Sequence, residues 1–397
     1  MRPIDHPGLE DSATPPSEGG ELCCPQKEGS FVAEPSSSNY VNVTRNHFRN
    51  RATTRLIGWT IIVAITAIAI FADFLAPYDY REQSRGEPSA PASGIYFHDS
   101  EGNLHFRPAV VSRRLIDPLR LQYTEDRSRM FPIAFFVRGY SYGLFGIIPT
   151  DIHLFGVSGS DDGTRINILG TDALGRDRFS RLLHAVRFSL IVCSLGVVFA
   201  CLIGIFIGVV SGYSGRLADT ILMGATDAML ALPTLILILA ARAAFPLELP
   251  PMRAAFLLLL IFALTGWAEM ARLARGLVWA TRQREFVTAA VATGVTQTRI
   301  LFRHILPNIS RPLFTQALLM LPAFLLAEIA LSYLGVGLQE PQASLGNMLT
   351  AASDLNQLRT QPISVLSPAI VIFIFVLGIR LLSDRKAPEA TATAPPF

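Results

Sequence analysis

The chain has 397 residues, half of them hydrophobic and only 16% of them charged, with a net charge of +3. Because an average globular protein carries about 25% charged residues, this composition argues against a soluble protein, and the small net charge gives no indication of a nucleic-acid partner. The apolar residues gather into runs of about 20, the length of a helix that crosses a bilayer, rather than into the ~10-residue alternating segments of a β-barrel. We therefore expect an all-α polytopic membrane protein.

The N-terminal part of the chain is polar up to the first apolar run. Residues 1–50 are rich in Pro, Ser, Gly and Glu with little periodicity, which predicts a disordered tail. The first predicted transmembrane helix covers residues 56–76. Four arginines precede it: Arg45, Arg49, Arg51 and Arg55. Because positive charges favour the cytoplasmic side of a membrane, these arginines place the N-terminus in the cytoplasm.

A long polar stretch, residues 78–168, separates the first apolar run from the second. We expect it to form a small mixed insert on the outer, periplasmic side. Two strand-like segments, Ile95–His98 and Leu104–Arg107, flank a turn at residues 100–103, which predicts a β-hairpin. An aromatic-rich part follows, from Phe131 to Phe155. The stretch is long enough for a small folded cap.

The remaining membrane region, residues 170–383, contains five more apolar runs. Their predicted spans are residues 188–210, 221–244 with a kink at Pro233, 254–271, 313–334 and 363–381. Six spans return the C-terminal tail, residues 384–397, to the cytoplasm. The loop from Arg272 to Arg303 agrees with this topology, because it holds six arginines and one acid, whereas residues 336–362 hold a single arginine.

Within this cytoplasmic loop, residues 285–308 have the pattern of two short helices. An apolar face of the first helix consists of Phe286, Val287, Ala290 and Val291. Gly294 suits the end of that helix, and Thr296 or Thr298 can cap the second helix. We expect Pro307 to end the second helix. The segment is therefore predicted to be a helix, a glycine turn and another helix.

This segment resembles the EAA loop of ABC importer permeases, in which Glu-Ala-Ala precedes a Gly and, further on, Ile-x-Leu-Pro. The residues in register are Ala289, Ala290, Gly294, Leu306 and Pro307. Two positions depart from the pattern, since Thr288 replaces the Glu and His304 replaces the Ile. The form found here is similar to the variant of dipeptide and oligopeptide permeases.

Three further segments resemble the same branch of the family. Residues 170–181 contain Gly-Thr-Asp, Gly-Arg-Asp and Ser-Arg before the second span. Residues 212–219 are similar to its Gly-Tyr-x-Gly-Gly-x-x-Asp link, and residues 328–337 to its Glu-x-x-Leu-Ser-Phe-Leu-Gly-x-Gly segment. The four motifs occur in the family's order, and the resemblance covers residues 168–383 well and the first span loosely.

The resemblance implies the six-helix, MetI-like fold of ABC importer permeases in a bacterial inner membrane. It implies two permeases, expected to be a heterodimer, two cytoplasmic P-loop ATPases that use the ATP, and an external binding protein that delivers peptides. The chain itself would have no catalytic residue and no cofactor, and no phosphate-binding Gly-x-x-x-x-Gly-Lys-Ser/Thr loop occurs in the sequence. The residues implied in ATPase coupling are Glu285, Phe286, Thr288, Ala289, Ala290, Gly294, Arg303 and Pro307.

Some interpretations stay open at this point. The substrate could instead be a nickel complex or a sugar, and the insert could dock the binding protein or cover the outer mouth. A proton- or sodium-driven transporter and a membrane scaffold are alternatives for the whole chain, although the internal repeat expected of the former is not evident.

Four acidic residues also admit two interpretations each. Asp227 and Glu328 fall within predicted spans, where ionisable groups are costly, and either line a pathway or bond to a neighbouring helix. Asp172 and Asp177 suggest either a metal or acid–base site or, as we expect, a capped amphipathic helix on the outer surface with both acids paired to arginine. We expect no metal site.

Overall fold

The computed structural model describes residues 37–98, 104–118, 120–144, 148–157, 163–246 and 249–383, and the predictions for the two tails lie almost wholly outside this part. The chain divides into two units, residues 1–50 and 51–397, and everything below concerns the second. The helices are α1 (Ser37–Ile70), α2 (Ala72–Leu75), α3 (Arg178–Tyr213), α4 (Arg216–Leu230), α5 (Thr234–Ala243), α6 (Pro251–Arg282), α7 (Glu285–Ala292), α8 (Gln297–Ile300), α9 (Leu306–Tyr333), α10 (Leu345–Leu349), α11 (Leu355–Thr360) and α12 (Pro362–Ser383).

Five of the described helices are long and apolar enough to cross a membrane: α1, α3, α6, α12 and the run from α8 through α9. Helices α4 and α5 supply a sixth span only as a bent pair, with 85° between them. The break lies at Pro233, which precedes α5 and has no N–H to continue the helical ladder. The helical membrane fold expected from the sequence is confirmed, with its third span broken rather than kinked.

Close contact between α3 and α6 forms the centre of the helix packing. A methyl group added to Gly204 would lie 2.5 Å from the carbonyl oxygen of Trp267. One added to Gly208 would lie 2.4 Å from the carbonyl oxygen of Ala271. Small residues let two membrane helices approach closely without a hydrophobic driving force between them, so these two glycines set the distance between the helices.

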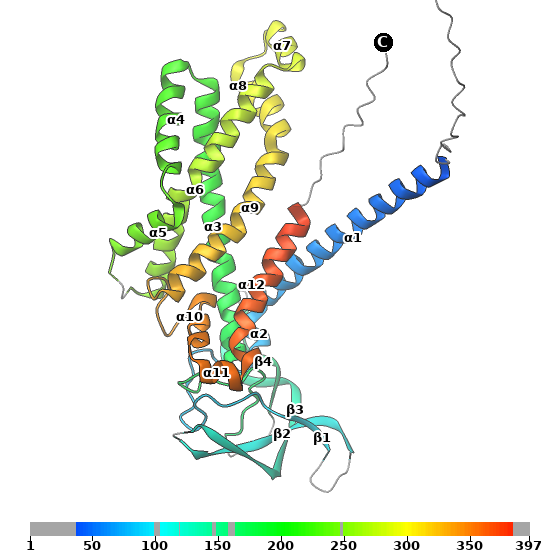
Figure 1. Cartoon of the computed structure of the whole chain (residues 1–397), viewed down its shortest axis with the longest axis vertical. Helices are drawn as coiled ribbons and strands as arrows, with labels where there is room; N and C mark the ends of the chain where they lie inside the picture. The colour runs from blue at the N-terminus through cyan, green and yellow to red at the C-terminus, as the bar shows by residue number, and fades with distance from the viewer. Residues whose placement is uncertain are drawn as a thin grey trace, which may run out of the picture. The chain divides into compact units, whose positions relative to one another are not determined.

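The insert between α2 and α3 is a four-stranded antiparallel sheet in the order β1-β2-β3-β4. Its strands are β1 (Ile95–His98), β2 (Leu104–Asp117), β3 (Gln122–Leu144) and β4 (Ile148–Val157). The predicted hairpin is confirmed, since Ile95 pairs with Val110 and His98 with Leu104, while its turn at residues 100–103 lies outside the described residues. The sheet lies at one end of the helices, and α7 and α8 lie at the other (Figure 1).

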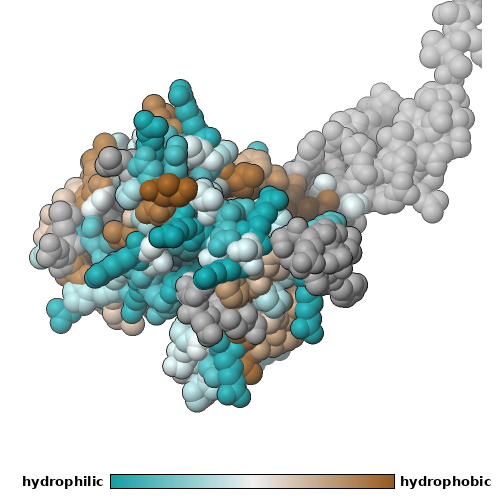
Figure 2. Space-filling view, turned by 90° about the horizontal axis from the view of Figure 1, so that it is seen from below, coloured by the Kyte–Doolittle hydropathy of each residue, from teal (hydrophilic) through white to brown (hydrophobic). Residues whose placement is uncertain are grey.

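The sheet end of the molecule has the surface of a part exposed to water. Seen from that end, the surface is mainly hydrophilic with separate hydrophobic patches (Figure 2). Buried His153 of β4 fastens the sheet to α2, because its two ring nitrogens lie 3.0 Å from the carbonyl oxygens of Asp73 and Tyr140. The insert is therefore attached to the membrane part by more than its two connecting chains.

Candidate functional site

Helix α7 follows α6 after a short turn, and its first residue, Glu285, places an acid where the helix dipole favours one. The helix ends before Gly294, whose φ of +81° is a left-handed conformation that glycine adopts easily. The N–H of Gly294 donates to the carbonyl of Val291 (3.0 Å), and the N–H of Val295 donates to that of Ala290 (3.2 Å). These are the two bonds of a Schellman motif, so the predicted glycine turn is confirmed.

Most residues implied in ATPase coupling are exposed at this end of the helices. Those exposed are Glu285, Phe286, Thr288, Ala289, Gly294, Arg303 and Pro307, whereas Ala290 is half-buried. Val287 is buried instead and, together with Ile300 and Ile305, packs the segment onto the spans. Phe286, Val291 and Phe302 keep 42%, 48% and 69% of their surface exposed, so the segment presents several large apolar side chains outward. Contact between these residues and a second chain stays a prediction.

The second helix of this segment does not end where the sequence suggested. Helix α8 passes through a π-helical turn, Leu301–Ile305, directly into α9. The prediction that Pro307 ends the helix is wrong, because Pro307 lies in the first turn of α9, directly after the π-helical turn. The N–H of Leu306 instead reaches back to the carbonyl of Leu301. Helix α8 is therefore continuous with a membrane span.

The motif at residues 170–181 is bonded to the segment that follows α9. Arg176 lies between Asp172, at 2.6 Å, and Glu340. Arg181 donates to the same Glu340 at 2.9 Å. Both arginines are nearly buried, at 5% and 3% exposure, where charges are stable only when they are paired. Because Glu340 follows α9 and the others precede or begin α3, the network ties together the ends of two spans. The predicted pairing of Asp172 with arginine is confirmed.

Asp177 has a different role from the predicted one. Its carboxylate accepts hydrogen bonds from the N–H and the hydroxyl of Ser180, both at 2.7 Å, and so caps α3. The prediction of an Asp177–arginine pair is wrong, and so is that of a separate helix on the outer surface. The helical pattern after Asp177 belongs to the second span itself, which begins at Arg178 rather than at residue 188.

Asp177 should make the stability of the protein depend on pH. Burial raises the pKa of its carboxyl to about 6 from an ordinary 3.8, although the hydrogen bonds from Ser180 act in the opposite direction. The folded state therefore binds this proton more tightly, and the resulting stabilisation is complete below about pH 4 and lost as the pH rises through 6. The Asp177→Asn variant keeps a capping oxygen but has no carboxyl proton to lose. We expect it to lack this pH-dependent loss of stability, which amounts to up to about 3 kcal/mol in the wild type.

The measurement is the midpoint of thermal unfolding of the wild type and the Asp177→Asn variant at pH 4, 5, 6 and 7. The difference between the two curves isolates Asp177 from all other titrating groups. Parallel curves over this range would contradict the assignment.

Glu328 of α9 is fully buried. Its carboxylate accepts hydrogen bonds of 2.9 Å from three serine hydroxyls, those of Ser189, Ser332 and Ser344. These serines belong to α3, to α9 itself and to the residue that caps α10. Of the two interpretations of Glu328, the bond to neighbouring helices is the one that this geometry favours.

A second group of charges within the spans lies on the surface of α4 and α6. Asp227 pairs with Arg272, and their side chains are 65% and 55% exposed. Glu269 is exposed nearby and accepts a hydrogen bond of 3.3 Å from Gln316. Glu269 also lines a cavity of about 300 Å³ between α4, α5, α6 and α9. Exposed charges within a span do not face lipid without a large cost, so this face is the candidate wall of a pathway.

Asp227 on this face was expected from the sequence, and Glu269 was not. The signal was available, because Glu269 lies within the predicted span 254–271, as Asp227 lies within 221–244. Both residues are ionisable groups inside an apolar run, so the reasoning that applied to Asp227 applies equally to Glu269.

Two family models match the chain. One, described as "Binding-protein-dependent transport system inner membrane component", matches residues 204–388. The other, described as "N-terminal TM domain of oligopeptide transport permease C", matches residues 47–91.

Individual relatives cover much of the same region. The oligopeptide transport system permease protein OppC of Bacillus subtilis is 34% identical over 215 residues, which cover 54% of this chain and 68% of the relative. The dipeptide transport system permease protein DppC of Alkalihalophilus pseudofirmus is 37% identical over 216 residues, covering 54% and 68%. A putative peptide permease protein of Brucella suis is 32% identical over 269 residues, covering 66% of this chain and 86% of the relative.

Proposed function

The chain belongs to the family of binding-protein-dependent transport system inner membrane components, and from this premise we propose that it forms one half of the peptide pathway of an ATP-driven importer. It is a transmembrane permease of the bacterial inner membrane. A second, different permease completes the pathway, two cytoplasmic ATPases bind and hydrolyse the ATP, and an external binding protein delivers dipeptides or oligopeptides. Both chain termini lie in the cytoplasm.

The observation that carries this proposal is the exposed segment from α7 to α8. Its Schellman turn fixes the direction of α7, and its exposed Phe286 offers an apolar anchor for a groove on another protein. Because the π-helical turn joins α8 to α9 without interruption, closure of the ATPases would move a membrane span as one piece with the docked segment. The segment and the insert lie at opposite ends of the helices (Figure 1), as a cytoplasmic motor contact and an external cap require.

The face that carries Asp227, Arg272 and Glu269 is the part of the surface best suited to the second permease. Apolar spans that expose charges need a polar neighbour or a water-filled space. Both are available at the junction of two permeases around a peptide pathway. The broken span from α4 to α5 contributes to the same face, where the cavity beside Glu269 lies.

Purification of the tagged full chain from its native membrane in a mild detergent tests the proposal. We expect a P-loop ATPase and a second permease to co-purify, and we expect strains without the chain to lose uptake of a labelled dipeptide or tripeptide. An ionophore that collapses ion gradients without lowering ATP should leave the uptake intact. Uptake that follows the ion gradient, or a chain that purifies without an ATPase, would overturn the proposal.

We further propose that the insert docks the external binding protein. Removal of the sheet is feasible because Ser93 and Asn167 bond to each other, each N–H donating over 2.8 Å to an oxygen of the other. A short Gly-Asn linker in place of residues 95–165 would therefore connect ends that are already adjacent. We expect this variant to take up peptide at least tenfold more slowly at low peptide concentration, because capture of the loaded binding protein fails.

Co-purification of the ATPase serves as the control for this deletion, since α7 and α8 lie at the far end of the helices (Figure 1). A variant that keeps its ATPase and loses capture supports a docking role. Unchanged uptake in a variant that keeps its ATPase would exclude it.

A further inference from the structure

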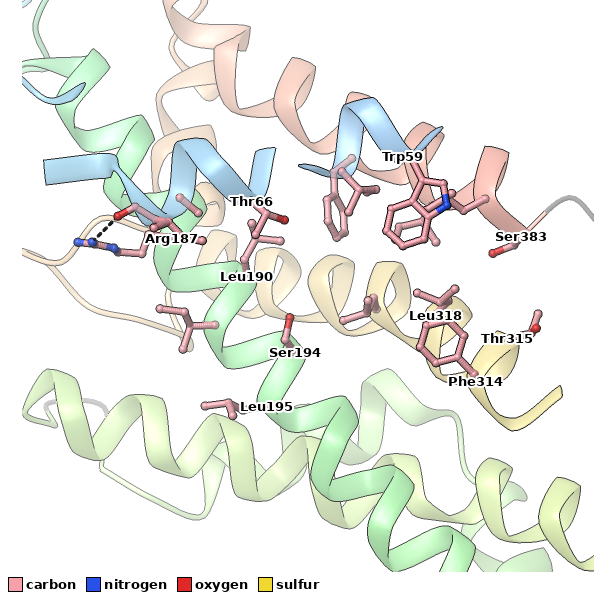
Figure 3. A pocket seen from close by; sticks show the side chains of 18 of the residues that line it. Trp59, Thr66, Arg187, Leu190, Ser194, Leu195, Phe314, Thr315, Leu318 and Ser383 are labelled. Carbon is pink, nitrogen blue, oxygen red and sulfur yellow. Dashed lines mark hydrogen bonds between the residues drawn. The ribbon is translucent and has the colours of Figure 1, made fainter. Parts of the chain in front are cut away.

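An open groove with a volume of about 680 Å³ runs along α1 between α3, α9 and α12. Figure 3 shows side chains from several of these helices turned toward it, among them Trp59 of α1, Leu190 of α3 and Leu318 of α9. Two glycines hold α1 against α12 beside it, since a methyl group added to Gly58 would lie 3.0 Å from the carbonyl oxygen of Gly378. The groove is therefore a product of fixed helix packing.

The lining of the groove suits hydrocarbon and, within the described part of the chain, includes one charge without a carboxylate partner. Most lining residues are apolar, and the ionisable ones among the described residues are Arg55 and Arg187. Arg187, at one end, is paired with Asp73 at 2.5 Å. It also donates to the carbonyl of Ile70 at 3.0 Å, the bond drawn as a dashed line in Figure 3. Its charge is thereby neutralised. The guanidinium of Arg55, at the other end, has no carboxylate beside it among the residues that the structure describes.

A second arginine adds to the positive charge at that end. Arg311 is exposed and lies one helical turn before Thr315, which lines the groove. No Asp or Glu occurs in α1 or α12, and the one acid of α9, Glu328, lies near its opposite end. An apolar groove beside two guanidinium groups that no described carboxylate neutralises favours an amphiphile with a negative head.

The groove is long enough for an acyl chain. From Arg55 to Ile70 helix α1 rises about 22 Å, which exceeds the ~15 Å of hydrocarbon in one leaflet. The charged face of α4 and α6, not this one, has the polar groups that a partner permease can satisfy.

We propose that this groove is a binding site for an anionic glycerophospholipid. One acyl chain lies along α1 past Trp59, and the phosphate contacts Arg55 and Arg311. The two arginines add selectivity for anionic over zwitterionic headgroups, because arginines near a membrane surface attract anionic lipid. The lipid comes from the cytoplasmic leaflet, and this detail alone rests on the proposed function through its topology.

A photo-crosslinking amino acid identifies the occupant in the assembled transporter. We would place p-benzoylphenylalanine at Trp59, irradiate the complete transporter in its native membrane and weigh the products by mass spectrometry. A lipid adduct is expected. A crosslink to the partner permease, or no adduct while the same probe at exposed Phe373 outside the groove yields one, would overturn the proposal.

Selectivity is measured in nanodiscs that contain equal amounts of phosphatidylglycerol and phosphatidylcholine. We expect the probe at Trp59 to capture the anionic lipid at least fivefold more often, and the double variant Arg55→Gln with Arg311→Gln to bring the ratio close to one. The matched control is Arg216→Gln, which removes an exposed arginine remote from the groove and should leave the ratio unchanged. Equal capture of both lipids by the unmodified groove would refute an anionic site.

Discussion

Replacement of Gly294 by leucine is expected to lower peptide uptake at least tenfold while the protein still inserts into the membrane. A leucine side chain would find space, because no atom lies within 4 Å of the position of its Cβ. The cost comes from the φ of +81°, which disfavours any residue with a Cβ by about 1–2 kcal/mol. Relief of this strain requires a change of φ, and that change swings α7 away from the direction in which it meets the ATPase.

Gly335 provides a matched control for this substitution. It has a φ of +73°, open space around its Cβ position, and the same pair of bonds, from its own N–H to Ser332 and from Val336 to Leu331. Gly335→Leu therefore introduces equal strain at the opposite end of α9. We expect ATPase co-purification and uptake to fall in the Gly294 variant and to persist in the Gly335 variant. Equal uptake by the two variants would contradict a coupling role of the α7–α8 segment.

The helical membrane fold could be predicted from the sequence because bilayer thickness sets a minimum length for apolar runs. The third span shows where this reasoning stops. Residues 221–244 form one apolar run, and hydropathy does not register that Pro233 divides it into two helices 85° apart. Whether a proline kinks or breaks a span depends on which neighbouring groups satisfy the freed carbonyls. That is a property of the packed structure.

In the α7–α8 segment, the glycine turn could be predicted from the sequence, but the continuous helix from α8 into α9 could not. Gly294 has a strong local signal, because few other residues adopt the conformation that a Schellman turn needs. Pro307 has an ambiguous one, since proline is as common in the first turn of a helix as just beyond the end of one. Asp177 is a similar case, because a capping acid and a salt-bridged acid look alike in sequence.

Replacement of Glu328 by alanine is expected to destabilise the protein by about 3–5 kcal/mol, because each buried donor left without an acceptor costs about 1–3 kcal/mol and the cavity adds to this. The three serine hydroxyls that donate to its carboxylate would lose their acceptor in a site that water does not reach, and a cavity would remain. Ser344 also caps α10, so the loss should spread to the segment after α9. The midpoint of thermal unfolding in detergent should fall by about 10 °C.

Glu328→Gln separates the loss of the network from the loss of a charge. The amide oxygen can still accept from Ser332 and Ser344, and Ser189 can rotate its hydroxyl to accept from the amide nitrogen, since a hydroxyl both donates and accepts. This variant should therefore unfold within a few degrees of the wild type and retain peptide uptake. A glutamine variant that is as stable as the wild type but transports nothing would show that Glu328 acts in the pathway through its charge. An alanine variant of normal stability would show that the hydrogen bonds between the serines and Glu328 do not contribute to the stability of the protein.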